Sequence, residues 1–164
     1  MNILPIALED LVHARSIESA RREFKKSWND VIADAVFRTV CAFANDLQNL
    51  NGGYLVLGVD ESEGLPILPP HGLDDLDVDL IQREIFGGCL ARIDPEYQPV
   101  VAPEVFQGKR ILVIWAPPGD ARPYQAREHG GKGAAKYHYV RLASSTAAAK
   151  GDILTQLLQL TARI

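Results

Sequence analysis

Three acidic residues and one lysine in the first part of the chain have the types and spacing that suit chemistry on a phosphate. They are Glu18, Glu23, Asp60 and Lys25. Carboxylates from separate elements can together hold Mg²⁺ or Mn²⁺ beside a phosphate, and a nearby lysine can stabilise the charge that develops there. The three acids are therefore candidate metal ligands, and together with Lys25 they are candidate catalytic residues of a metal-dependent nuclease.

The same residues also have a purely structural interpretation. The pattern Glu23-x-Lys25 is common by chance, and its two side chains can simply pair with each other. Asp60 can cap the turn that follows a strand. Glu61 is the alternative to Asp60, because strand ends are predicted only to within about one or two residues. The residues alone leave both interpretations open.

Positive charge is concentrated in the C-terminal third, although the net charge of the chain is −4. Residues 105–150 contain eight Lys or Arg and two acidic residues, whereas residues 57–104 contain two and eleven. A locally positive surface can bind phosphates on an acidic protein, and aromatic rings can stack on bases. The alternative is a pair of solvated loops of opposite charge. The candidate nucleic-acid-binding residues are Arg21, Arg22, Lys25, Lys26, Lys132, Lys136, Tyr137 and Arg141.

A helix, a glycine turn and a buried strand must position these side chains. Apolar residues at i, i+3 and i+4 spacing predict a long helix from Ser27 to Asn45. Asn51-Gly52-Gly53 then predicts a turn, and the apolar run from Tyr54 to Val59 predicts a strand covered on both faces. If residues 21–26 are extended, Glu23 and Lys25 share one face and Phe24 enters the core. The helix would return the chain and bring Asp60 close to Glu23.

The remaining pattern predicts a mixed sheet with helices packed on it, in a single α/β (α+β) domain that spans residues 1–164. Residues 122–136 are expected to form a polar loop. The other expected elements are a helix at 6–15, a helix at 74–90, strands at 100–106 and 111–115, a strand at 137–142 and a helix at 151–160.

Several classes of protein are disfavoured by the composition. No apolar run approaches the roughly 20 residues that a membrane helix needs, and the N-terminus lacks the features of a secretory signal. Cys41 and Cys89 are isolated, without the spacing of a zinc site. The turn at Gly52 lacks the spacing of nucleotide-binding glycine loops. We therefore expect a cytoplasmic protein with no membrane partner.

Read together, several short motifs resemble the Schlafen AlbA-2 domain family. They are Glu18 with Glu23-Phe24-Lys25, Ala42-Phe43-Ala44-Asn45, Gly52-Gly53, Gly58-Val59-Asp60, and Tyr139-Val140-Arg141 with Ser144-Ser145-Thr146. The resemblance covers nearly the whole chain. It departs from the family at Ala143, where a glycine is usual. It implies an AlbA-like fold and a DNA-binding module at the N-terminus of a longer bacterial regulator. RNA-cleaving members use a similar set of three carboxylates.

Three functions are therefore expected from the sequence, in decreasing order of support. The first is a nucleic-acid-binding module of a bacterial transcriptional regulator, with DNA or RNA as its partner. The second is a Schlafen-type endoribonuclease that acts on tRNA or rRNA and uses Mg²⁺ or Mn²⁺. The third is an interaction module, in which the long helix and the sheet edge would form a homodimer.

Overall fold

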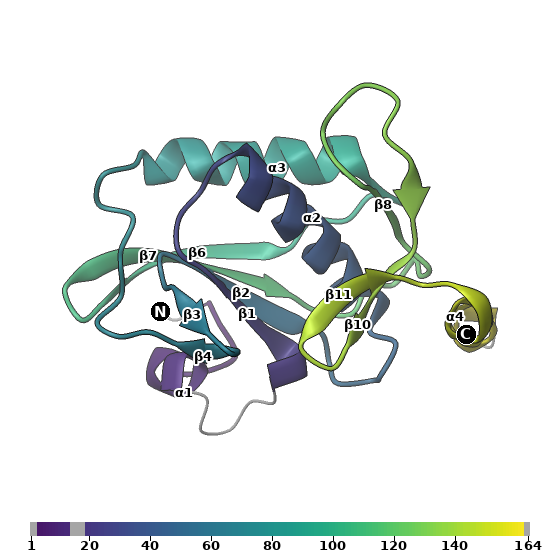
Figure 1. Cartoon of the computed structure of the whole chain (residues 1–164), viewed down its shortest axis with the longest axis horizontal. Coiled ribbons are helices and arrows are strands. Elements are labelled where there is room, and N and C mark those ends of the chain that lie inside the picture. Colours follow the sequence, from purple (N-terminus) through teal and green to yellow (C-terminus); the bar gives the residue numbers. More distant parts are fainter. Residues whose placement is uncertain (1–2, 14–18, 163–164) are drawn as a thin grey trace.

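The computed structural model describes residues 3–13 and 19–162, built around a four-stranded sheet (Figure 1). The strand order is β1-β2-β7-β6. β1 runs parallel to β2, whereas β2–β7 and β7–β6 are antiparallel pairs. The sheet is therefore mixed, which confirms the predicted fold class. Its strands are β1 (Arg22–Lys25), β2 (Gly53–Leu57), β6 (Val100–Phe106) and β7 (Lys109–Ala116).

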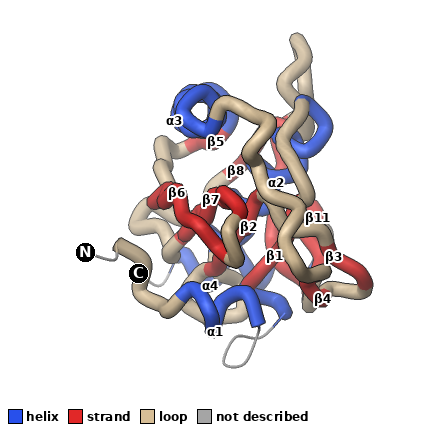
Figure 2. The backbone as a smooth tube through the Cα atoms, turned by 90° about the vertical axis from the view of Figure 1, so that its left-hand side faces the viewer, coloured by secondary structure: helices blue, strands red, loops and turns tan. Residues whose placement is uncertain are grey.

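Helices cover both faces of this sheet (Figures 1 and 2). α2 and α3 share a core with Leu55 and Leu57 of β2. α1 packs on the other face with Phe24 and Val56. This double coverage explains why every residue of β2 is buried, as the apolar run predicted. The helices are α1 (Leu8–His13), α2 (Asp30–Asn45), α3 (Val78–Arg92) and α4 (Gly151–Ala162), with a 3₁₀ turn η1 (Ser19–Arg21).

In the described part of the chain, seven short strands lie outside the central sheet. They are β3 (Glu61–Ser62) paired with β4 (Leu65–Pro66), a small sheet ordered β5 (Ile93–Asp94), β8 (Gln125–Arg127) and β9 (Lys136–Tyr137), and the hairpin of β10 (Tyr139–Leu142) and β11 (Ser145–Ala148). The polar loop expected over 122–136 therefore contains β8 and the first residue of β9, and residues 128–135 between them form a loop as predicted. β8 has only three residues, which is too short for an alternating pattern to show.

Both long helices begin later than the sequence predicted. α2 starts after Asn29, whose side chain accepts a hydrogen bond from the Ile32 amide at 2.9 Å. α3 starts after Asp77, whose carboxylate accepts one from the Leu80 amide at 3.0 Å. Asn and Asp are strong N-caps, because their oxygens satisfy amides that lack a partner in the first turn. The earlier polar residues were wrongly assigned to the helices.

The glycine turn between α2 and β2 is confirmed and has a specific support. Asp46 ends α2 in the left-handed conformation, and its carboxylate accepts amide hydrogen bonds from Leu50, Asn51 and Gly52 at 2.9–3.3 Å. Gly52 has φ +75°, and a Cβ there would lie 2.1 Å from the Ala116 carbonyl oxygen. Only glycine fits this approach of the turn to β7.

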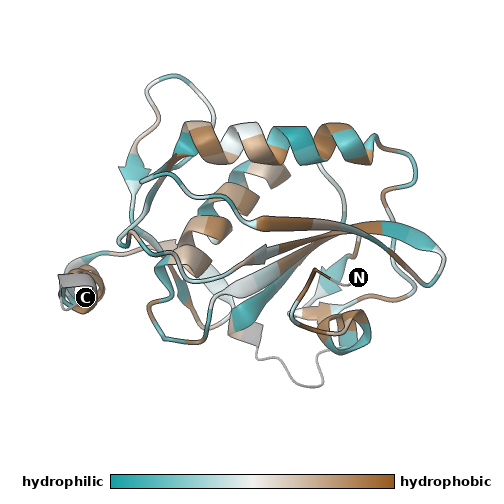
Figure 3. Cartoon of the chain, turned by 180° about the vertical axis from the view of Figure 1, so that it is seen from behind, coloured by the Kyte–Doolittle hydropathy of each residue, from teal (hydrophilic) through white to brown (hydrophobic). Residues whose placement is uncertain are grey.

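α4 lies beside the body of the domain (Figure 1). Its buried Leu157 joins Leu47, Val140 and Ala149 in a small cluster of its own. Figure 3 shows that apolar residues run along the strands of the central sheet. Within residues 3–13 and 19–162, no helix is long and apolar enough to cross a membrane.

Candidate functional site

The carboxylate of Glu23 lies where β1, α2 and β10 meet, and three side chains contact it. Its Oε1 is 2.8 Å from Arg141 Nη1, and its Oε2 is 3.6 Å from Lys25 Nζ. Thr39 on α2 donates its hydroxyl to Oε2 at 3.2 Å. Phe24 is buried on the opposite side of β1. The prediction that Glu23 and Lys25 share one face of the strand is thus confirmed.

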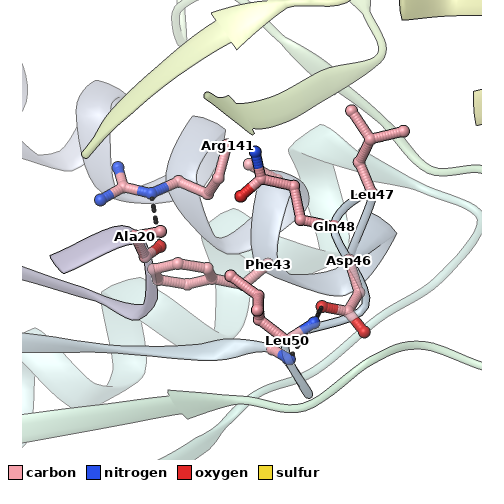
Figure 4. A pocket seen from close by; sticks show the side chains of 9 residues that line it. Ala20, Phe43, Asp46, Leu47, Gln48, Leu50 and Arg141 are labelled. Atoms are coloured by element: carbon pink, nitrogen blue, oxygen red, sulfur yellow. Dashed lines mark hydrogen bonds between the residues drawn. The ribbon is translucent and has the colours of Figure 1, made fainter. Parts of the chain in front are cut away.

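Arg141 on β10 pairs with Glu23, and Figure 4 shows its side chain beside Ala20 and Phe43. Its Nε donates to the Ala20 carbonyl at 3.1 Å, and its Nη2 donates to the Arg22 carbonyl at 3.2 Å. Its guanidinium lies over the Phe43 ring, 5.2 Å from the centroid. Only 5% of Arg141 is exposed. The side chain therefore ties β10 to the start of β1 through charge-assisted hydrogen bonds.

The second acid near Glu23 is Glu61, the alternative to Asp60. Burial raises the pKa of the Glu61 carboxyl, and the Glu23 carboxylate raises it further, while Lys25 lowers it. Burial acts on the carboxyl although much of the Glu61 residue is exposed. The Asp60 carboxylate instead accepts a hydrogen bond from the Glu61 amide at 2.9 Å. Glu61 is therefore close enough to Glu23 and Lys25 for their charges to interact, and the expected proximity of Asp60 to Glu23 stays a prediction.

The third predicted metal ligand, Glu18, lies outside the described residues. Within the described ranges, no three His, Cys, Asp or Glu side chains are grouped so that they could hold a metal ion. Both oxygens of Glu23 already have partners in Arg141, Lys25 and Thr39. The three-carboxylate metal site therefore stays a prediction.

We expect Glu61→Gln to stabilise the domain at neutral and alkaline pH. The raised pKa means that folding disfavours the ionised carboxylate. This group's favourable contribution is present at low pH and is lost as the pH rises through the raised pKa. The variant should raise the thermal midpoint by about 1 °C at pH 8 and by less at pH 4. Glu63→Gln, on the exposed turn between β3 and β4, is the control. An equal rise at both pH values would contradict this assignment.

The predicted basic residues near β1 point in different directions. Arg22 lies on the α1 face, where its Nη1 donates to the carbonyls of Leu11 and Val12 at 3.3 and 3.5 Å. It is 5% exposed, and burial lowers its pKa. Arg21 lies over the Tyr54 ring at 5.9 Å, and Lys26 is exposed. Because Arg22 and Arg141 have buried intramolecular partners, we leave both out of the proposed nucleic-acid interface.

The other predicted residues, Lys132, Lys136 and Tyr137, lie at the β8–β9 hairpin, a separate place on the surface. Lys136 Nζ is 3.7 Å from Asp94 Oδ2, and Lys150 lies 6.0 Å from the Tyr137 ring centroid. Sequence analysis missed Arg92 and Arg127, which share this end of the molecule with Lys132. The charge count indicated the basic segment 105–150, but it did not indicate that α3, which carries Arg92, faces this segment.

Sequence analysis also missed two threonines of the Glu23 cluster. Thr39 and Thr146 hydroxyls are 2.8 Å apart, and Thr146 also accepts from Arg141 Nη1 at 3.0 Å. Thr39 is 1% exposed. A polar residue on the apolar face of a predicted helix was the available signal, because buried hydroxyls need hydrogen-bond partners.

A mixed sheet with α2 and α3 on one face, α1 on the other and a charged cluster beside β1 defines an α/β domain. Residues 18–150 match the family described as Schlafen, AlbA_2, and the chain belongs to this family. The expectation from the sequence motifs is confirmed.

Solved structures that are similar to this chain include the following two. The N-terminal domain of a RecG-related protein from Nitrosomonas europaea is 31% identical, with a TM-score of 0.53; the match covers 87% of this chain and 85% of that one. The DIP2311 protein of Corynebacterium diphtheriae is 20% identical, with a TM-score of 0.55 over 86% of this chain. The chain spans 29% of the length of DIP2311. No curated protein matches the sequence.

Proposed function

We propose that this domain binds nucleic acid, as the binding module of a bacterial transcriptional regulator. Membership of the Schlafen AlbA_2 family supports the proposal. The similar Nitrosomonas europaea protein is described as related to the ATP-dependent DNA helicase RecG, which also supports a role on nucleic acid. Function cannot rest on fold analogy alone, so a feature of the surface must carry the proposal.

That feature is the positive charge at the end of the molecule formed by the β8–β9 hairpin and the start of α4. Residues 121–150 contain six Lys or Arg, of which Arg141 is buried in the Glu23 cluster, and a single acidic residue, Glu128. Lys132, Lys136 and Lys150 are exposed there. Such a surface attracts phosphates even though the whole chain is acidic. Lys109 and Arg110 lie far from this end, at the β6–β7 turn, and Lys109 Nζ is 3.9 Å from Asp74 (Figure 1).

We expect saturable binding of at least one nucleic acid at low salt. Fluorescence anisotropy with labelled single-stranded DNA, double-stranded DNA and tRNA measures it. The association constant should fall steeply with salt, because bound phosphates release counterions. A signal that fails to saturate with all three nucleic acids would contradict the proposed function. The interaction module would then remain as the candidate function, and sedimentation would test it by detecting the homodimer.

A second candidate is metal-dependent cleavage of RNA, and the Glu23–Lys25–Glu61 group is the observation that favours it. A carboxyl such as Glu61, whose pKa is raised by burial and by a neighbouring carboxylate beside a lysine, is typical of functional sites. A divalent ion there would supply Lewis-acid chemistry at a phosphate. Glu61 and Lys25 are the described residues with the greater freedom to contact such a ligand, because Glu23 is held by Arg141.

If this candidate is right, Lys25→Met should lower Mn²⁺-dependent cleavage of tRNA by about 100-fold. The change removes the cation beside the phosphate and leaves the Glu23–Arg141 pair intact. Lys26→Met, at the next and exposed position, is the matched control. Gel assays of labelled tRNA give the rates. Equal rates in both variants would leave the binding function alone.

A further inference from the structure

A hollow of about 480 Å³ lies between the C-terminal end of α3 and the loop that joins β8 to β9. This volume is in the range of sites for small ligands and ligand groups. Three cations line it, and no acidic side chain of the described chain does. The lining residues are Gly88, Ala91, Arg92, Arg127, Gly130, Gly131 and Lys132.

The loop is glycine-rich, but it is held in place by α2. Asp34 Oδ1 accepts hydrogen bonds from the Gly130 amide at 3.2 Å and from Arg92 Nη1 at 2.5 Å. Arg38 donates to the Glu128 carbonyl at 2.5 Å. A Cβ at Gly130 would lie 2.3 Å from Arg92 Nη2, so glycine lets the backbone lie against that guanidinium. The geometry of the hollow is therefore built by residues from two helices and the hairpin.

The hollow carries an excess of positive charge. Asp34 neutralises Arg92, whose guanidinium also lies 4.7 Å from the Phe37 ring centroid. Arg127 and Lys132 form no ion pair with any residue in the described part of the chain. Carbonyl oxygens at the end of α3 do not attract an anion, so binding must come from the side-chain cations on the hairpin side. Two such cations suit a phosphate group, whereas the Gly130 and Gly131 amides already donate to Asp34 and His129.

We propose that this hollow binds one phosphate group of a nucleic-acid backbone, with Arg127 and Lys132 as its direct contacts. Arg92, fixed by Asp34, forms the wall behind the phosphate. The inference rests on the proposed function and deepens it, because it names the surface that meets the nucleic acid. It separates this surface from the Glu23 cluster, so the hairpin positions the backbone without taking part in chemistry at Glu23.

The combined substitution Arg127→Ala and Lys132→Ala tests the inference in the full 164-residue chain. We expect about tenfold weaker binding of the nucleic acid that the wild type binds best. The slope of the logarithm of the association constant against the logarithm of salt should shrink by about 1, because one phosphate contact is lost. Lys109→Ala with Arg110→Ala removes the same charge at the β6–β7 turn and should change binding less than twofold. Circular dichroism confirms that both variants are folded.

A second measurement locates the ligand directly and separates nucleic acid from free phosphate. In spectra of ¹⁵N-labelled protein, an oligonucleotide should shift the amides of Gly130, Gly131 and Lys132. If the oligonucleotide binds but these amides and the double variant are unaffected, the inference is overturned and the proposed function stands. If no nucleic acid binds, both are overturned. Shifts with inorganic pyrophosphate alone would reassign the hollow to free phosphate and overturn the backbone assignment.

Discussion

Replacing Asn45 by alanine is expected to lower the free energy of unfolding by about 3–5 kcal/mol. Asn45 is 2% exposed at the end of α2. Its Nδ2 donates to the carbonyls of Tyr139 and Tyr124 at 2.8 and 3.0 Å, and its Oδ1 accepts from the Tyr124 amide at 2.7 Å. One amide therefore joins the helix to β10 and to the segment before β8. Alanine would leave the Tyr124 amide and the Tyr139 carbonyl without this partner in the core.

Urea unfolding followed by tryptophan fluorescence measures this loss, with Gln48→Ala as the control. Gln48 is exposed three residues later, and its change should stay within about 0.5 kcal/mol. Asn45→Asp keeps the acceptor but sets a carboxylate against two carbonyl oxygens. Its deficit should shrink as the pH falls from 7 to 4, because protonation removes the charge and restores a donor. A loss below 1 kcal/mol for Asn45→Ala would show that the network is not structurally important.

Asn45 also shows how far the sequence could predict the fold. Periodicity gave α2, and the apolar run gave β2, because both elements bury continuous stretches that leave a pattern. The motif that ends in Asn45 carried the family resemblance. Its physical role was not visible, because its partners lie 79 and 94 residues away. Contacts between distant segments depend on the fold that they help to build.

The candidate site could also be predicted only in part, because some of its contacts join segments that are distant in the sequence. Strand alternation placed Glu23 and Lys25 together, since that spacing is local. The interaction of Glu61 with Glu23 could not be predicted, because it depends on where β2 ends and the chain turns into β3. The candidate nucleic-acid-binding residues lie in three separate parts of the structure. Arg22 lies on the face of β1 opposite Glu23, because successive side chains alternate along a strand. Arg141 is buried and belongs to the Glu23 cluster. A count of charges cannot distinguish a solvated lysine from an arginine inside the protein.

Ala143 is a smaller example in which the family pattern and the structure agree in physical terms. It occupies the two-residue turn between β10 and β11 and has φ +54°. Glycine, which is usual there in the family, adopts this conformation without a steric cost. The departure from the motif therefore changes the residue but not the turn.

The second large effect is expected for Arg141→Met, which should lower the free energy of unfolding by about 3–5 kcal/mol. The guanidinium pairs with Glu23 at 2.8 Å, and the side chains of Arg141 and Glu23 are 6% and 12% exposed. Methionine fills much of the volume but leaves Glu23 without its closest cation. The carbonyls of Ala20 and Arg22 also lose a donor. Lys136→Met, which breaks the exposed pair with Asp94, should cost less than about 1 kcal/mol.

A double-mutant cycle with Glu23→Gln separates the ion pair from the rest of the loss. The two changes together should cost about 1–3 kcal/mol less than the sum of the single changes, because removing Arg141 no longer strands a carboxylate. Additive losses would show that Arg141 acts through the backbone carbonyls and Phe43 rather than through Glu23. If Arg141→Met instead weakened nucleic-acid binding and left the unfolding free energy unchanged, Arg141 would belong to the interface. Burial and its four hydrogen-bond partners argue for the structural role.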